Sequence, residues 1–207
     1  MREKEKATSI IYVRHGQADF PHDRLYCDER EDPSLTAEGL AQAQQAAILL
    51  ADQSIEAIYS SPMLRTRKTA ELIADRSTTG VIFEPRLKER PFGIWDGLYF
   101  DEIARDFPDQ FQAWKRDPIS FVPEGGETIN AHMDRVKSAL QDIIDNHRGQ
   151  RILVVSHVGP IRMCITDALG MPLSSYRRLT IDYASVTRVD YGRKQNNLIY
   201  MNISGKL

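Results

Sequence analysis

The sequence predicts an α/β fold, a three-layer α/β/α sandwich whose central sheet is mostly parallel. Two short apolar runs rich in β-branched residues, 10–13 (IIYV) and 152–155 (ILVV), have the character of strands buried on both faces. Helical patterns lie between the candidate strands, and this alternation is typical of a parallel sheet covered by helices. We expect one domain over residues 1–207, because no repeat or linker divides the chain.

The other candidate strands are shorter or lie nearer the C-terminus. Residues 55–59 and 81–83 are apolar runs of the same buried type, so we place them in the parallel part of the sheet. Residues 181–189 and 198–203 suggest two more strands toward one edge. The chain order up to residue 83 is then strand, helix, strand, helix, strand.

Capping residues mark the first two helices. Thr36 is a candidate N-cap for a helix that ends near residue 51, with Glu38 in its first turn. Ser61 and Pro62 are suited to the N-cap and first helical position of a helix that ends near residue 75.

Two further helices flank the run at 152–155. Residues 128–147 repeat apolar side chains every three or four positions, which is typical of an amphipathic helix. His132 lies on its polar side and His147 near its C-terminal end, so we expect both to be structural or solvent-exposed. Pro160 can open the last helix, which ends near residue 169.

Residues 90–127 interrupt this rhythm with four prolines, a Gly-Gly pair and two short helical pieces. We interpret them as a small helical cap inserted over a site. Trp95, Phe107, Phe111 and Trp114 are expected to pack this cap against the sheet.

The overall charge restricts the possible partners. The 207 residues carry 27 Lys and Arg against 29 Asp and Glu, a formal net charge of -2. Nucleic-acid-binding proteins usually carry a basic excess, so we expect no nucleic-acid partner. No stretch is long and apolar enough for a targeting segment or a membrane span, and we expect a cytoplasmic protein that is a monomer or a homodimer.

Cys27 and Cys164 lie far apart in the sequence and form no CxxC pair, so we expect reduced thiols and no zinc site. The acidic run at residues 28–32 is interrupted by Arg30 and is expected to be a solvated loop.

Polar residues follow four candidate strands at their carboxyl ends, which is where open α/β sheets bind ligands. They are Arg14, His15, Gly16 and Gln17 after the first run, Arg65 after the second, Glu89 after the third, and Ser156 and His157 after the fourth. Arginines bind phosphate oxygens through paired hydrogen bonds, and histidines can act as nucleophile and as donor. These residues predict a phosphate pocket without a metal ion.

Glycines support this pocket. Gly16 lets the backbone approach a ligand closely, and Gly159 with Pro160 begins a helix whose N-terminal amides favour an anion. The GxxxxGK[ST], HExxH and GxSxG motifs do not occur in the sequence.

The site residues stand in an ordered set of motifs: RHG at 14–16, LTAEG at 35–39, SSPxxRxRxTA at 60–70, LKE at 87–89, FGxWxG at 92–97, GGET at 125–128 and SH at 156–157. This set resembles the histidine phosphatase superfamily, also called phosphoglycerate mutase-like. The FGxWxG motif and the short segment up to GGET resemble its phosphatase branch, which includes alpha-ribazole phosphatase-like and broad-specificity members.

The resemblance implies a role for each residue. His15 is the nucleophile and forms a phosphohistidine, while its other ring nitrogen donates to a backbone carbonyl. Arg14, Arg65 and His157 bind the phosphoryl oxygens, and Glu89 protonates the leaving oxygen. Gln17, His22 and Val158 are expected as further substrate contacts, with no metal or cofactor.

We therefore expect a metal-independent phosphatase that hydrolyses phosphomonoesters of small metabolites. One alternative is a cofactor-dependent phosphoglycerate mutase, although such enzymes are typified by a longer insertion rich in basic residues than 90–124. Another is a regulatory module that binds a phosphorylated ligand with low turnover. Pro21 motivates it, because many family members have an asparagine six residues after the nucleophile.

Overall fold

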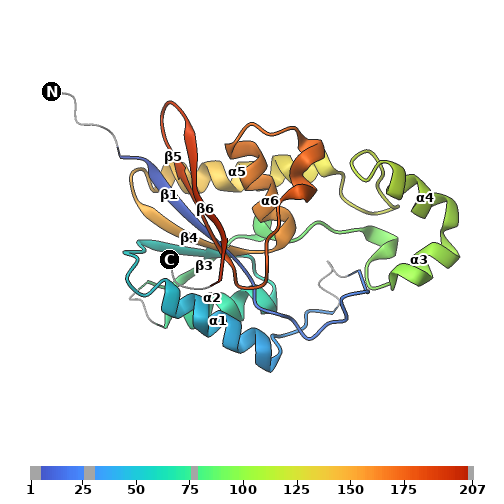
Figure 1. The fold of residues 1–207 in the computed structure, drawn as a ribbon, viewed down its shortest axis with the longest axis horizontal. Helices are drawn as coiled ribbons and strands as arrows, with labels where there is room; N and C mark the ends of the chain where they lie inside the picture. Colours follow the sequence, from blue (N-terminus) through green and yellow to red (C-terminus); the bar gives the residue numbers. More distant parts are fainter. Residues whose placement is uncertain (1–5, 26–30, 76–78, 205–207) are drawn as a thin grey trace.

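The computed structural model of the protein describes residues 6–25, 31–75 and 79–204. These residues form a six-stranded sheet between two layers of helices, with a helical cap at one end of the sheet (Figure 1). The strands are β1 (Thr8–Arg14), β2 (Ala57–Ser60), β3 (Val81–Phe83), β4 (Arg151–Ser156), β5 (Val186–Tyr191) and β6 (Asn196–Ile203).

The sheet has the strand order β3-β2-β4-β1-β5-β6. Strands β1 to β4 are mutually parallel, whereas β5 pairs antiparallel with β1 and β6 pairs antiparallel with β5. The predicted three-layer architecture with a mostly parallel sheet is confirmed.

Each face of the sheet has its own helical layer. Helices α1 (Ala37–Leu49) and α2 (Leu64–Ala74) cover one face, and α5 (Ile129–Asn146) and α6 (Val158–Ala168) cover the other (Figure 1). The two central strands divide their side chains between these layers, with Ile11, Val13, Leu153 and Val155 in one core cluster and Ile10, Tyr12, Ile152 and Val154 in the other. Burying an aliphatic side chain contributes about 1.5–3 kcal/mol, so this alternation anchors β1 and β4 at the centre of the sheet.

Two of the expected strands differ from the structure. The sequence suggested that residues 81–83 are buried, but Ile82 is 48% exposed and Phe83 is 42% exposed, because β3 is an edge strand. β5 begins at Val186 rather than at residue 181. Ala184 has a φ of 51° and Ser185 donates to the Asp182 carbonyl, so a turn occupies this stretch.

The predicted start of α1 is confirmed, whereas the predicted starts of α2 and α6 are wrong. Thr36 caps α1 as predicted and accepts a hydrogen bond from Gly39 N–H (2.9 Å). Helix α2 begins two residues later than predicted, with Met63 as its N-cap. Its first N–H, from Leu64, donates to the carboxylate of Asp32, a partner 32 residues away in the sequence. Helix α6 begins at Val158, two residues before Pro160.

The cap consists of α3 (Phe100–Asp106) and α4 (Pro108–Arg116), preceded by a 3₁₀ turn at Gly93–Trp95. Trp95 is buried, and its ring contacts those of Phe107, Phe111 and Trp114 at centroid distances of 6.2–6.5 Å. These aromatic rings form a cluster separate from the two clusters beside the sheet. The expectation that they pack the cap against the sheet is therefore wrong, because the cap has a small core of its own.

Across the described ranges, no helix is both long and apolar enough to cross a membrane. Cys164 is buried and carries a free thiol, whereas Cys27 lies outside the described residues.

Gly16 and Gly39 place the loop after β1 directly on the first turn of α1. A Cβ on Gly16 would overlap the carbonyl oxygen of Gly39, and a Cβ on Gly39 would overlap that of Gln17. The role predicted for Gly16, room for a ligand, is therefore wrong, because the room is taken by the α1 backbone.

We expect Gly39→Ala to lower the free energy of unfolding by about 2 kcal/mol, because overpacking forces the two backbones apart. Urea denaturation measures this change. The matched control is Gly80→Ala, where an added Cβ meets nothing within 4 Å, and it should stay within about 0.5 kcal/mol of wild type. Equal stability of the two variants would contradict the packing argument.

Candidate active site

His15 and His157 lie side by side at the carboxyl ends of the two central strands. Arg14 of β1 is in register with Ser156 of β4, so the next residue of each strand enters the same space. His15 N–H donates to the Ser156 carbonyl (3.0 Å), and the two imidazole centroids are 5.2 Å apart. Both rings are buried, with exposures of 7% and 1%.

The tautomer of His15 follows from its backbone contact. Nδ1 lies 2.7 Å from the carbonyl oxygen of Gly16, which can only accept a hydrogen bond, so Nδ1 carries the proton and Nε2 keeps a free lone pair. Burial, followed by the charges of Arg65 and Arg14, lowers the pKa of His15 well below its ordinary value. The ring is therefore neutral at neutral pH, as a nucleophile must be.

Two guanidinium groups lie beside these imidazoles. Arg14 Nη1 donates to the Ile181 carbonyl (2.8 Å), and its guanidinium lies 3.8 Å from the centre of the Tyr183 ring. Arg65, in the first turn of α2, is only 3% exposed and lies 3.7 Å from a carboxylate oxygen of Asp32. Burial removes water from each guanidinium group, which costs free energy, and these contacts offset part of that cost.

Asp32 corrects the interpretation of the acidic run as a solvated loop. Its carboxylate accepts the Leu64 N–H (2.8 and 2.9 Å) and pairs with Arg65, so it both caps α2 and orients the arginine. Residues 28–30 of this run lie outside the described residues.

His157 is the N-cap residue of α6, and its Nε2 lies 2.8 Å from Ser61 Oγ. Ser61 Oγ also accepts a hydrogen bond from Met63 N–H (3.5 Å) and can donate its own proton to Nε2. In the tautomer in which Ser61 donates, the ring proton is on Nδ1, which is buried and has no hydrogen-bond partner among the described residues, so it can donate to a bound ligand. Burial and then the charge of Arg65 lower the pKa of His157 well below its ordinary value.

Glu89 is held by backbone amides. Its Oε1 accepts from Arg90 N–H (2.8 Å) and its Oε2 accepts from Gly159 N–H (3.0 Å). A Cβ on Gly159 would overlap Oε1, so a glycine is required there. The expectation that the N-terminal amides of this helix receive a ligand anion is corrected at Gly159, since the anion that it holds is the Glu89 carboxylate.

One cavity of about 190 Å³ is lined by the five side chains to which the resemblance assigned catalytic roles: Arg14, His15, Arg65, Glu89 and His157. Among the further expected contacts, His22 and Val158 also line it. The amide oxygen of Gln17 instead accepts a hydrogen bond from Thr36 Oγ1 (3.1 Å), and Gln17 is not in the wall of this cavity as the described residues define it. Residues of the wall that the sequence reasoning did not assign to ligand contacts are Ala18, Phe20, Pro21, Arg24 and Tyr183.

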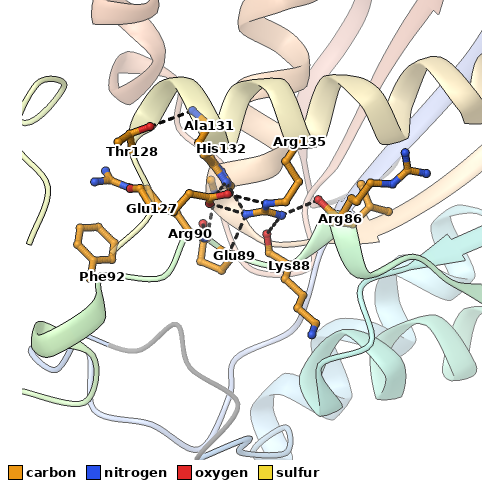
Figure 2. A network of polar contacts seen from close by, with 12 residues as sticks. Arg86, Lys88, Glu89, Arg90, Phe92, Glu127, Thr128, Ala131, His132 and Arg135 are labelled. Atoms are coloured by element: carbon orange, nitrogen blue, oxygen red, sulfur yellow. Dashed lines mark hydrogen bonds and ion pairs between the residues drawn. The ribbon is translucent and has the colours of Figure 1, made fainter. Parts of the chain in front are cut away.

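Arg135 of α5 fixes the segment that carries Glu89 (Figure 2). Its Nη1 donates to the carbonyls of Arg86 (2.6 Å) and Lys88 (3.0 Å), while its Nε and Nη2 donate to the carboxylate of Glu127 (2.8 and 2.7 Å). A paired guanidinium and carboxylate of this kind is geometrically specific. One side chain therefore joins α5, the Glu89 segment and the end of the cap.

His132 belongs to the same network. The prediction placed it on the polar side of the helix, but the structure does not. It is completely buried, and its Nδ1 lies 2.8 Å from Arg135 Nη2 and 3.1 Å from Glu127 Oε2. Hydropathy alone assigned it to the outer side of α5, but its partners Glu127 and Arg135 allow a polar ring to be buried.

The Glu127 network predicts a pH-dependent stability. Burial raises the pKa of Glu127, but hydrogen bonds from Arg135 and His132 outweigh it and lower this pKa to about 2 from an ordinary value of 4.5. A carboxyl group with a depressed folded-state pKa stabilises the protein above its unfolded-state pKa and loses that contribution as pH falls through the folded-state pKa.

We expect Glu127→Gln to destabilise the protein by about 3 kcal/mol or less at pH 7. The difference from wild type should shrink between about pH 5 and 2. Urea denaturation at a series of pH values measures it, with Glu124→Gln, at an exposed neighbouring position, as the control. A difference that stays constant over this pH range would contradict the role of the charged carboxylate.

A family model described as the histidine phosphatase superfamily (branch 1) matches residues 10–204. Phosphoserine phosphatase 1 of Hydrogenobacter thermophilus is 32% identical over 195 residues, which are 94% of this chain and 92% of that protein. An Escherichia coli protein named "Probable phosphoglycerate mutase GpmB" is 33% identical over 186 residues, covering 88% and 84% of the two chains.

Among solved structures, the alpha-ribazole phosphatase from Shigella flexneri superposes with a TM-score of 0.88 at 28% identity. The match covers 96% of this chain and 98% of that one. The likeness therefore extends over the sheet, both helical layers and the cap.

Proposed function

The chain belongs to the histidine phosphatase superfamily and is a phosphomonoesterase, and from this premise we propose that it hydrolyses phosphomonoesters of small metabolites through His15 without a metal ion. The observation that carries the proposal is the meeting of a neutral imidazole, two guanidinium groups, a second imidazole and a carboxyl group in one cavity of about 190 Å³. A phosphoryl group needs a nucleophile, donors for its oxygens and a proton for its leaving group, and this cavity offers each of them.

In the first step, His15 Nε2 attacks phosphorus while the bond from phosphorus to the leaving oxygen breaks. Arg14, Arg65 and His157 Nδ1–H donate to the three non-bridging oxygens, where donors fixed in advance contribute on the order of 3 kcal/mol each to the transition state. Glu89 donates a proton to the leaving oxygen.

In the second step, water attacks the phosphohistidine and Glu89 accepts a proton from it, so the phosphorus–nitrogen bond breaks and inorganic phosphate leaves. Proton transfer by a placed carboxyl group of this kind contributes about 10²- to 10⁴-fold in rate. The proton that Glu89 lost in the first step is restored, and the site returns to its starting state.

Pro21, which motivated the regulatory alternative, lies in the wall of the cavity and offers no side-chain donor. His22 and Arg24, one and three residues after Pro21, line the same cavity with polar side chains. This supports turnover in spite of the proline. The mutase alternative differs in the acceptor of the phosphoryl group, which is a second organic molecule rather than water.

We expect His15→Ala to lower p-nitrophenyl phosphate hydrolysis at least about 1,000-fold, because loss of a nucleophile removes the covalent path. Wild type quenched during turnover with labelled substrate should retain an acid-labile phosphoryl group that the variant lacks. The control is His147→Ala, which should keep its label. His147 lies on the Tyr59 side of the sheet, with its Nε2 3.0 Å from Tyr59 Oη. Labelling of His15→Ala would contradict the assignment.

The reaction should persist after dialysis against EDTA, since the proposed donors are side chains of the protein. The measurement is the initial rate before and after chelation, with and without added Mg²⁺. A loss of activity that Mg²⁺ restores would contradict the metal-free mechanism.

A further inference from the structure

Tyr183 lies beside the two residues at the carboxyl end of β1. Its half-buried side chain lines the catalytic cavity. The centre of its ring is 3.8 Å from the guanidinium carbon of Arg14 and 5.8 Å from the centre of the His15 ring. The reaction proposed above gives this tyrosine no part, although it contacts both the nucleophile and one of the phosphoryl donors.

Two contacts fix the orientation of the Arg14 guanidinium group. Its Nη1 donates to the Ile181 carbonyl (2.8 Å), and its central carbon lies over the face of the Tyr183 ring. A hydrogen bond at one nitrogen leaves the group free to rotate about that bond, and the attraction between the cation and the ring face restricts this rotation. Arg14 Nε is buried and has no hydrogen-bond partner among the described residues. The edge formed by Nε and Nη2 is therefore the one that remains for two phosphoryl oxygens.

The turn that carries Tyr183 is bonded to the end of β1. Ala184 N–H donates to the His15 carbonyl (3.2 Å), and Arg14 N–H donates to the Ser185 carbonyl (3.3 Å). Ala184 has a φ of 51°, a left-handed conformation that costs free energy in a residue with a side chain. The backbone hydrogen bonds hold the turn in this conformation, so the position of the Tyr183 ring is set by the main chain.

Asn202 of β6 braces the same turn. Its amide oxygen accepts a hydrogen bond from Asp182 N–H (2.6 Å), and its amide nitrogen donates to the Asp182 carboxylate (2.8 Å). Asn202 also has a left-handed backbone, with a φ of 60°, and its own N–H donates to Thr187 Oγ1 (3.1 Å). Asparagine adopts this conformation more readily than most residues. One side chain of the last strand thus binds the residue next to Tyr183 through both its backbone and its carboxylate.

We infer that Tyr183 is a positioning residue of the phosphoryl transfer and that Asn202 holds it in place. The face of the Tyr183 ring sets the orientation of Arg14, so that Nε and Nη2 meet the phosphoryl oxygens as charge shifts in the transition state. The phenol hydroxyl has no part in this role, since the ring makes the contact. The inference rests on the proposed function, because it concerns a donor of that reaction.

The first test separates the ring from the hydroxyl, with p-nitrophenyl phosphate as substrate. Tyr183→Phe keeps the ring and should stay within about twofold of the wild-type kcat/KM. Tyr183→Leu removes the ring and should lose about tenfold, the scale of a contact between a desolvated cation and an aromatic face. The loss should lie mainly in kcat, because the orientation of a donor matters most in the transition state. Tyr200→Leu, the same substitution in β6 and outside the wall of this cavity, is the matched control and should keep the wild-type rate.

A double-mutant cycle shows whether Tyr183 acts through Arg14. In protein that already carries Arg14→Met, the further change Tyr183→Leu should alter kcat/KM by less than about twofold, because the group to be positioned is gone. A tyrosine that acted directly on the nucleophile, or that only stabilised the fold, would cause the same loss in both backgrounds.

Asn202→Gly tests the second part of the inference. Glycine keeps the left-handed backbone and removes both contacts to Asp182. We expect kcat to fall about threefold, the scale of a lost hydrogen bond, and the loss to disappear in the Arg14→Met background.

Thermal unfolding of each variant shows whether it is folded at the assay temperature. Wild-type activity in Tyr183→Leu, an equal loss in Tyr183→Phe, or a loss that persists in Arg14→Met would overturn the role of Tyr183 and leave the proposed function intact. An unchanged kcat in Asn202→Gly would overturn the role of Asn202. The proposed function itself would fail if His15→Ala hydrolysed p-nitrophenyl phosphate as fast as wild type.

Discussion

The parallel pairing of β1 with β4 is the constraint on which the rest of the site depends. Both strands are buried on both faces, so any change in their register would move apolar side chains out of both cores at once. With the register fixed at Arg14 and Ser156, the next residue of each strand is placed without further freedom. Two imidazoles in ring contact are then a direct consequence of backbone hydrogen bonding and hydrophobic packing.

Around this pair, the protein buries several cations and keeps the imidazoles neutral. Arg14 contacts a carbonyl and an aromatic ring, and Arg65 lies 3.7 Å from a carboxylate oxygen. Burial, followed by the positive charges of Arg65 and Arg14, lowers the pKa of His15, which keeps its lone pair available. The same positive charges that help to lower the pKa of the histidines attract a phosphoryl dianion.

The sequence predicts the centre of the fold and the five inner side chains because both follow from local signals. Continuous apolar runs mark buried strands, and the ends of parallel strands must meet. The contacts that orient those side chains depend on residues distant in the chain. Asp32, which caps α2, and Tyr183, whose ring lies against Arg14, carry no local signal. The apolar repeat places His132 on the polar side of its helix, because such a repeat does not show a polar ring that is buried with its own partners. Gln17 was placed in the pocket by its position after β1, but its amide oxygen accepts a hydrogen bond from Thr36 at the start of α1.

The two ends of the cap are joined to each other as well as to the catalytic segment. Arg90 Nε donates to the Glu127 carbonyl (2.7 Å), and Glu127 N–H donates to the Pro91 carbonyl (3.0 Å). Between these points the cap folds around its own aromatic cluster. Residues between 91 and 127 can therefore change, and with them the molecules that enter the cavity, while the contacts that hold Glu89 stay the same. The cap is thus a part of the fold that can be exchanged without moving the Glu89 segment.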